Sequence, residues 1–239
     1  MLRDSQRGPE VLMVRRRAGD AFGESYTFPG GILDADESLA RNYCDGVSAD
    51  EANALLNVPD GGLDYFSAVI RELFEETGIL LARKGNEWPT VSTLLQALRK
   101  NVDQATLAWP DFLHEQGLRM ACDAVHYFAY WETPRSLPKR WSTRFFLART
   151  PDGQVASHDD GELTDIRWLT ASDALAAGRS GDMKLPFPTV ATLKDLADFD
   201  SCTSVLNWAQ TRAQEGIDKI LPVMLTDDGK TKIVTSNDD

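Results

Sequence analysis

An amphipathic helix with a row of carboxylates is the stretch that most constrains this chain. Residues 68–79 read Ala-Val-Ile-Arg-Glu-Leu-Phe-Glu-Glu-Thr-Gly-Ile, and at about 100° per residue the large apolar side chains share one face. Glu72, Glu75 and Glu76 lie on the opposite face, where like charges three and four residues apart destabilise a helix. Gly78 is typical of the residue that ends a helix. This arrangement indicates a site for a hard divalent cation, which prefers oxygen ligands.

A solvated acidic surface is the alternative interpretation of this helix. It would suit an isolated Glu-Glu pair. It does not account for Arg71 directly before Glu72, for the second acidic pair one turn later, or for the closing Gly-Ile. We therefore favour the cation site.

The string Arg-Glu-Leu-x-Glu-Glu-x-Gly-Ile at residues 71–79 resembles the core of the Nudix box, the signature of the Nudix hydrolases. Gly31 and Glu37 stand upstream at the spacing that opens the box. Residues 38–70 then intervene, which is 33 residues in place of the usual seven. The chain resembles the branch of the family with an insertion at this point, which includes acyl-coenzyme A diphosphatases of Nudix type 19. We expect the insertion over about residues 38–63.

The resemblance extends from about residue 11 to about residue 195 and implies an α+β Nudix fold. In that fold a mixed β-sheet is sandwiched between helices, here with a helical insertion and a helical C-terminal extension over about residues 186–239. We expect one domain over residues 1–239, because no repeat or linker interrupts the sequence. The insertion is expected to roof the site or to form an interface, which leaves a homodimer open.

Local patterns predict the remaining elements. Strands are expected at 11–15, 125–131, 144–148 and 166–169, helices at 48–56, 92–102, 111–120, 170–177, 189–199 and 203–215, and a hairpin from 219–225 and 230–234. Residues 1–9 are expected to form a loop, with a short edge strand around residues 1–3 as the alternative, and Trp109-Pro110 to separate two helices. Ser48 and Glu51 are expected to form a capping box, Thr170 to cap a later helix, and Asp228-Gly229 to form the turn of the hairpin.

The resemblance implies one to three Mg²⁺ or Mn²⁺ ions on the acidic helix. The implied metal ligands are Glu72, Glu75, Glu76, the Gly30 carbonyl and Glu162. Asp159 and Asp160 are the rivals of Glu162. Glu72 is the candidate for orienting or deprotonating a water whose pKa the metal lowers. Arg71 is expected to pair with a neighbouring carboxylate, such as Glu75 four residues later, rather than to contact the substrate.

Three arginines are candidate substrate contacts, because the arginine fork matches phosphate oxygens. They are Arg15 and Arg16 at the end of the first predicted strand and Arg144 at the start of another. The alternative is a basic strand end for Arg15 and Arg16 and a surface arginine for Arg144.

The implied reaction is hydrolysis of a diphosphate linkage in coenzyme A or acyl-coenzyme A, giving 3′,5′-ADP and (acyl-)phosphopantetheine. ADP-ribose or a dinucleotide such as NADH is the alternative substrate. A Nudix-fold module that binds a ligand without catalysis is the alternative of another class. Such modules usually lose carboxylates, whereas this chain keeps Glu72, Glu75 and Glu76.

Charge and composition argue against a nucleic-acid or membrane partner, and the resemblance implies a small-molecule nucleoside diphosphate derivative. Lys and Arg number 25 and Asp and Glu 37, and the net charge of −12 argues against nucleic acid. The sequence has no long apolar run and no apolar signal region, so no membrane partner is expected. Three widely spaced cysteines predict no disulfide framework. A bacterial cytoplasmic protein is the simplest interpretation.

Overall fold

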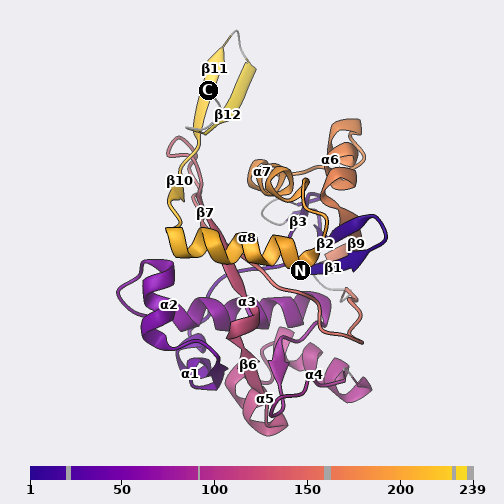
Figure 1. The fold of residues 1–239 in the computed structure, drawn as a ribbon, viewed down its shortest axis with the longest axis vertical. Helices are drawn as coiled ribbons and strands as arrows, with labels where there is room; N and C mark the ends of the chain where they lie inside the picture. Colours follow the sequence, from indigo (N-terminus) through magenta and orange to yellow (C-terminus); the bar gives the residue numbers. More distant parts are fainter. Residues whose placement is uncertain (20–22, 91, 159–162, 228–229, 236–239) are drawn as a thin grey trace.

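The computed structural model describes residues 1–19, 23–90, 92–158, 163–227 and 230–235 (Figure 1). The strands are β1 (Leu2–Ser5), β2 (Gly8–Arg16), β3 (Tyr26–Thr27), β4 (Cys44–Asp45), β5 (Ala82–Arg83), β6 (Arg119–Ala121), β7 (His126–Glu132), β8 (Ser142–Leu147), β9 (Leu163–Thr170), β10 (Lys219–Ile220), β11 (Val223–Asp227) and β12 (Lys230–Val234). The helices are α1 (Glu37–Ala40), α2 (Ala49–Leu56), α3 (Gly62–Thr77), α4 (Thr93–Asp103), α5 (Trp109–Gln116), α6 (Ala171–Ser180), α7 (Phe187–Leu196) and α8 (Cys202–Glu215), with 3₁₀ turns η1 (Arg41–Tyr43) and η2 (Cys122–Ala124).

Strand β2 is the centre of a sheet in which all pairs are antiparallel. β1 and β3 lie in succession along one edge of β2, and β9 lies along the other. In a second sheet β8 pairs antiparallel and β10 parallel with β7. The two sheets meet at Leu2, whose N–H donates to the Ala148 carbonyl at 2.9 Å and whose carbonyl accepts from the Thr150 N–H at 2.8 Å.

Alternate residues of β2 and β7 supply two separate cores on opposite faces. Leu12 and Tyr127 pack in the core that contains α3 and α5, whereas Met13 and Phe128 pack in the core that contains α6, α7 and α8. This alternation follows from the two-residue period of a strand. It confirms the prediction of a sheet sandwiched between helices.

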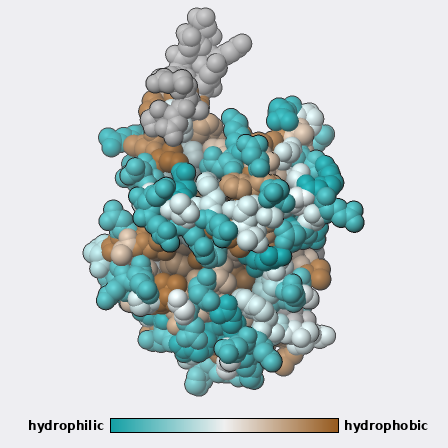
Figure 2. Space-filling model, viewed as in Figure 1, coloured by the Kyte–Doolittle hydropathy of each residue, from teal (hydrophilic) through white to brown (hydrophobic). Residues whose placement is uncertain are grey.

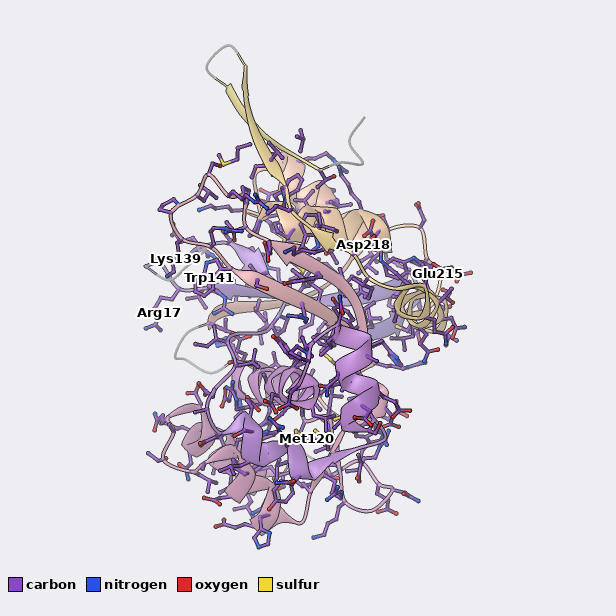
Figure 3. All side chains as sticks on the ribbon, turned by 90° about the vertical axis from the view of Figure 1, so that its left-hand side faces the viewer. Arg17, Met120, Lys139, Trp141, Glu215 and Asp218 are labelled. Carbon is purple, nitrogen blue, oxygen red and sulfur yellow. The ribbon has the colours of Figure 1, made fainter. Side chains whose placement is uncertain are left out.

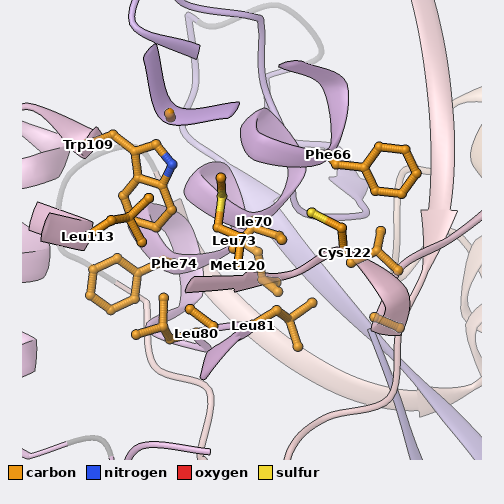
Figure 4. Packing of buried hydrophobic residues seen from close by; sticks show 14 of the residues in the cluster. Phe66, Ile70, Leu73, Phe74, Leu80, Leu81, Trp109, Leu113, Met120 and Cys122 are labelled. Carbon is orange, nitrogen blue, oxygen red and sulfur yellow. The ribbon is translucent and has the colours of Figure 1, made fainter. Parts of the chain in front are cut away.

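The first core is built on the apolar face of α3 (Figure 4). Phe66, Ile70 and Phe74 have no exposed surface. Phe74 stacks on Phe112 of α5 with ring centroids 5.2 Å apart. Burial of each such side chain contributes on the order of 1.5–3 kcal/mol. The predicted apolar face therefore fixes the direction in which the carboxylates of the same helix point.

The insertion contains the predicted helix, and it also contains the start of α3. Ser48 and Glu51 form the predicted capping box of α2. The Gly62 N–H donates to the Asn53 side-chain oxygen at 2.7 Å. A Cβ on Gly62 would lie 2.5 Å from the Ala52 carbonyl carbon. Helix α2 thus packs directly on the first turn of α3, and α3 begins inside the range expected for the insertion.

Two short strands occupy places where the sequence predicted other structure. Residues 1–9 are not a loop; the alternative of a short edge strand is correct, because β1 forms a hairpin with β2. The predicted helix at 111–120 is wrong at both ends, because α5 begins at Trp109 and ends before Gly117. Pro110 lies in the first turn of α5, where a backbone N–H has no partner within the helix and is not needed. Residues 119–121 then form β6 between β4 and β5. Pairing with residues distant in sequence overrides the local helical pattern.

The C-terminal extension is helical only to the end of α8. The prediction placed residues 219–225 in one strand, but β10 pairs with β7 and only β11 pairs with β12. The β11–β12 hairpin projects from the body of the protein (Figure 1). The predicted turn Asp228-Gly229 lies outside the described residues.

The face seen in Figure 2 is mainly hydrophilic. In Figure 3, Lys139 and Trp141 of the β7–β8 connection lie at one edge, and Glu215 at the end of α8 lies at the opposite edge.

In the part of the chain that the structure describes, no helix is both long and apolar enough to cross a bilayer.

Candidate active site

The last two turns of α3 place three carboxylates beside the turn that follows β3. The side chains of Glu72, Glu75 and Glu76 are only 14%, 12% and 6% exposed. They are therefore not the solvated acidic face that was the alternative interpretation of this helix. Gly78, with φ of 72°, ends the helix as predicted.

Arg71 joins three parts of the predicted box. Its guanidinium donates to Glu37 at 2.8 Å, to Glu75 at 2.7 Å and to the Ile32 carbonyl at 2.9 Å. A further nitrogen–oxygen distance of 3.0 Å pairs it with Glu72. The predicted pairing of Arg71 with Glu75 is thus confirmed. This guanidinium holds α1 and the segment after the glycine turn against α3.

Arg16 makes the second arginine contact with the carboxylates. Its guanidinium donates to Glu76 Oε1 at 2.8 Å and also to the Gly30 carbonyl. The Gly30 N–H donates to Glu76 Oε2 at 2.8 Å. Both oxygens of Glu76 are therefore engaged, and the end of β2, the glycine turn and α3 meet at this carboxylate.

The two glycines of the turn have different reasons to lack a side chain. Gly30 has φ of 145°, a conformation that favours glycine. Gly31 has no such backbone requirement, but a Cβ there would lie 2.4 Å from a carboxylate oxygen of Glu72. The second glycine thus leaves room for the carboxylate predicted to act as the base.

Burial changes the acidity of this cluster. It raises the pKa of Glu75 to about 7, with Glu72 adding to the effect and Arg71 opposing it. Burial also raises the pKa of Glu37, which hydrogen bonds from Ser67 and Arg71 partly offset. The pKa of Arg71 is raised despite its burial, because Glu72, Glu75 and Glu37 favour its charge. Arg71 is therefore a permanent cation within the site.

Residues of α4 and of the segment before β9 support the end of α3. The guanidinium of Arg99 donates to the Glu75 backbone carbonyl at 2.9 Å and to the Ser157 hydroxyl at 3.1 Å. The side chain of Gln154 bonds to both the N–H and the carbonyl of Leu80, at 2.8 and 3.1 Å. No sequence pattern points to Arg99 or Gln154, because their partners are distant in the chain.

The remaining predicted substrate arginines lie away from Glu76. Arg15 is on the opposite face of β2 from Arg16 and lies 3.9 Å from Glu24. The Arg144 guanidinium lies between the rings of Tyr65 and Tyr130, 4.4 and 4.5 Å from their centroids. Tyr65 precedes Glu76 by three turns, about 16 Å along the helix.

The predicted ligand Glu162 and its rivals Asp159 and Asp160 lie outside the described residues. The structure gives no position to this part of the proposed metal site.

The predicted metal ligands are chemically suited to a divalent cation, and two of them, Glu76 and the Gly30 carbonyl, lie close together. The carboxylates and the Gly30 carbonyl are the hard oxygen ligands that Mg²⁺ and Mn²⁺ prefer. Gly30 and Glu76 already share one cationic group, the Arg16 guanidinium. Among the described residues, however, no three His, Cys, Asp or Glu side chains are placed to hold one ion. Glu72 and Glu75 face Arg71 instead.

A small cavity lies beside this cluster. Its volume is about 90 Å³, and Asp34, Glu37, Arg71, Glu75 and Trp109 are among its lining residues. Sites for small organic ligands occupy roughly 300–1,000 Å³. This cavity accommodates water-sized molecules and is too small for a nucleotide.

Comparison with known proteins identifies the family. A family model described as the NUDT19 Nudix domain matches residues 47–196. The acyl-coenzyme A diphosphatase NUDT19 of Homo sapiens is 27% identical over an alignment of 271 positions, which covers 97% of this chain and 72% of the human protein. Putative nudix hydrolase 7 of Caenorhabditis elegans is 24% identical, over 80% of this chain and 58% of that protein.

A solved structure shows the same fold. The crystal structure of a NUDIX hydrolase from Alicyclobacillus acidocaldarius superposes with a TM-score of 0.72 and 24% identity, covering 86% of this chain and 91% of that one. The resemblance predicted from the split box is confirmed. The chain belongs to the Nudix hydrolases of the NUDT19 type and is a Nudix diphosphatase.

Proposed function

We propose that this protein is a metal-dependent diphosphatase of coenzyme A or acyl-coenzyme A. The observation that carries the substrate class is the likeness over 97% of the chain to the human acyl-coenzyme A diphosphatase. The relatives from Gallus gallus and Xenopus laevis, 24% and 25% identical, carry the same description. The products would be 3′,5′-ADP and (acyl-)phosphopantetheine.

The clustered oxygens at the end of α3 support the metal requirement. Glu72, Glu75, Glu76 and the Gly30 carbonyl would hold Mg²⁺ or Mn²⁺, with Glu162 as the proposed additional ligand. When bound, the ion neutralises diphosphate oxygens and lowers the pKa of a coordinated water. The net charge of −12 makes this local reversal of sign necessary for an anionic substrate.

The side chains have distinct roles in the proposed reaction. Glu72, whose carboxylate lies beside Gly31, takes the proton of the attacking water. Attack at phosphorus breaks the bond to the bridging oxygen, and each product leaves as a phosphate monoester. Arg16 contacts the diphosphate oxygens through its fork. Arg71 is occupied by four partners and orients Glu72 and Glu75 without touching the substrate.

Product analysis by mass spectrometry tests this function. The purified protein is incubated with coenzyme A, short and long acyl-coenzyme A, ADP-ribose and NADH, each with Mg²⁺, Mn²⁺ or a chelator. We expect metal-dependent release of 3′,5′-ADP from the coenzyme A compounds and no release with the chelator.

Each other outcome points to one alternative. Release of AMP from ADP-ribose or NADH, without release of 3′,5′-ADP, would show that these compounds rather than coenzyme A are the substrates. Diphosphate hydrolysis would remain the reaction. Binding of coenzyme A without any product would favour a non-catalytic module. Hydrolysis that persists in chelator would overturn the metal requirement.

A further inference from the structure

Arg144 lies between two aromatic rings, on the face of the second sheet that α3 covers. Its guanidinium is 4.4 Å from the ring centroid of Tyr65 in α3 and 4.5 Å from that of Tyr130 in β7. Tyr130 stands directly opposite Arg144 in the pairing of β7 with β8. Phe146, two residues later in β8, packs on Phe66 of α3 with ring centroids 5.4 Å apart. Arg144 and Phe146 therefore face α3 from the same side of β8.

The neighbours of Arg144 hold its guanidinium without neutralising it. One N–H donates to the Leu56 carbonyl at the end of α2, at 3.2 Å, and the guanidinium lies beside the Tyr127 hydroxyl. The Nε atom is buried and has no hydrogen-bond partner in the part of the chain that the structure describes. Among these described residues, no carboxylate forms an ion pair with Arg144. A partly buried cation without a counter-ion, in a protein of net charge −12, indicates a place for an anionic ligand.

A partly exposed stripe of α3 connects this arginine with the candidate metal site. Tyr65, Val69 and Glu72 are partly exposed, whereas residues 66–68 and 70–71 between them are buried. Steps of four and three residues place all three on one side of the helix. Glu72 follows Tyr65 by two turns, about 10 Å along the helix axis. Arg144 therefore lies on the same side of α3 as Glu72, but too far away to bind the same phosphate group.

A second phosphate group of the proposed substrate suits this position. Coenzyme A and its acyl derivatives carry a phosphate monoester on the 3′-oxygen of the ribose, in addition to the diphosphate. ADP-ribose and NADH contain a diphosphate-linked adenosine without this group. The guanidinium fork matches phosphate oxygens. An anion-binding arginine at a distance from the diphosphate site thus has a partner in coenzyme A but none in the two alternative substrates.

Resting on the proposed function, we infer that Arg144 binds the 3′-phosphate of coenzyme A and acyl-coenzyme A. Tyr65 and Tyr130 fix the plane of the guanidinium between their rings. Arg144 is a substrate-binding residue that determines specificity and takes no part in breaking the diphosphate. Because Leu56 belongs to the insertion, the insertion contributes to substrate selection through its contact with Arg144.

The ratio of rates with two substrates tests this assignment. Under the same metal conditions, kcat/KM is measured with coenzyme A and with 3′-dephospho-coenzyme A for wild type, Arg144→Met, Arg144→Lys and Arg212→Met. We expect wild type to prefer coenzyme A by about tenfold to hundredfold, as for hydrogen bonds to a charged group. In Arg144→Met the ratio should fall to about one, through a loss of kcat/KM for coenzyme A alone. Arg144→Lys keeps the charge without the fork and should give an intermediate ratio.

Arg212→Met is the matched control. The Arg212 guanidinium also lies over an aromatic ring, that of Trp208, at 5.5 Å from the ring centroid. It also donates to a backbone carbonyl, that of Phe128, at 2.9 Å. Arg212 belongs to α8, however, which packs in the core on the opposite face of the sheet. We expect its substrate ratio to match that of wild type.

Binding of the nucleotide products gives a readout that needs neither metal nor turnover. Isothermal titration calorimetry in the presence of a chelator compares 3′,5′-ADP with AMP, which lacks the 3′-phosphate. Wild type and Arg212→Met should bind 3′,5′-ADP more tightly than AMP. Arg144→Met should bind both with the same Kd, because it has lost the group that contacts the 3′-phosphate.

A purely structural role for Arg144 gives a different result. Equal losses with both substrates in Arg144→Met would keep the wild-type ratio and overturn the inference. A wild-type ratio near one, with coenzyme A hydrolysed, would overturn it and leave the proposed function intact. If wild type hydrolyses neither compound, the proposed function fails, and calorimetry still decides whether Arg144 binds the 3′-phosphate. If Arg144→Met does not fold, Arg144→Lys decides, because its ratio must fall below that of wild type.

Discussion

The carboxylate of Glu37 and the guanidinium of Arg71 meet at 2.8 Å although 34 positions separate them in the chain. Both side chains are almost fully buried, at 2% and 6% exposure. This ion pair joins the two halves of the Nudix box, which the insertion separates in the sequence. It therefore connects the stability of the protein with the geometry of its site.

Loss of this pair should destabilise the fold. In Glu37→Gln the buried Arg71 loses one of its charged partners, and we expect the free energy of unfolding to fall by about 3–5 kcal/mol. Urea denaturation measures the change. The control is Asp45→Asn, which removes an ion pair with Arg119 whose side chains are 51% and 48% exposed. We expect a loss of no more than about 1 kcal/mol there, and equal losses in the two variants would contradict the role of burial.

Glu76→Gln should abolish activity while the protein stays folded. Loss of an outer-shell partner of a metal site costs about 10–100-fold, so loss of a proposed ligand should cost at least about 100-fold in kcat. The measurement is the rate of 3′,5′-ADP release together with the Kd for Mn²⁺. Glu115→Gln on the exposed surface of α5 is the control and should match wild type. Full activity and unchanged metal affinity in Glu76→Gln would remove this residue from the proposed site.

The raised pKa of Glu75 predicts opposite pH effects on folding and on metal binding. Because its pKa in the folded protein is about 7, above the ordinary value of 4.5, the folded state binds more protons between these values. The contribution of Glu75 to metal-free stability is therefore present below pH 4.5 and is lost as the pH rises through about 7. Metal needs the ionised carboxylate, so the affinity for Mn²⁺ should weaken as the pH falls below about 7.

Comparison with Glu75→Gln checks this assignment. The free energy of unfolding without metal and the Kd for Mn²⁺ are measured at several pH values on both sides of 7. The variant should lose the part of the stability slope that belongs to Glu75. A slope identical to that of wild type would assign the pH dependence to other groups.

Gly31→Ala should impair catalysis more than folding. The new Cβ would lie 2.4 Å from the Glu72 carboxylate, the far end of a flexible side chain that can move away. We expect kcat to fall at least about tenfold, as for a misplaced catalytic group. Gly85→Ala is the complementary control, because Gly85 has φ of 62° and no neighbour within 4 Å of an added Cβ. It should lower stability by about 1 kcal/mol and leave kcat unchanged. The same effect on kcat in both variants would rule out the steric explanation.

The sequence predicted the elements whose signals are local. The acidic helix, its end at Gly78, the Ser48 capping box and the cap at Thr170 all depend on residues within one or two turns. Strand β6 could not be predicted in this way, because its partners β4 and β5 lie far from it in the chain.

The same distinction applies to the candidate site. Helical spacing predicted that Glu72, Glu75 and Glu76 share a face and that Arg71 pairs with Glu75. Which face of β2 points toward Glu76 depends on how the residues of β2 are divided between the two cores. The sequence does not show this division, so Arg15 and Arg16 were predicted to have the same role. Arg99 donates from α4 to the backbone carbonyl of Glu75, and no residue spacing in the sequence predicts that contact.

The direct contact between Glu37 and Arg71 also explains how the box tolerates a long insertion. The entropy of closing a flexible loop grows only with the logarithm of its length, so lengthening the intervening segment from seven to 33 residues costs about 1.4 kcal/mol. Breaking a buried ion pair costs about 3–5 kcal/mol. The segment between the two halves can therefore lengthen at a small cost in free energy, because the Glu37–Arg71 ion pair, rather than a short backbone connection, holds the two halves of the box together.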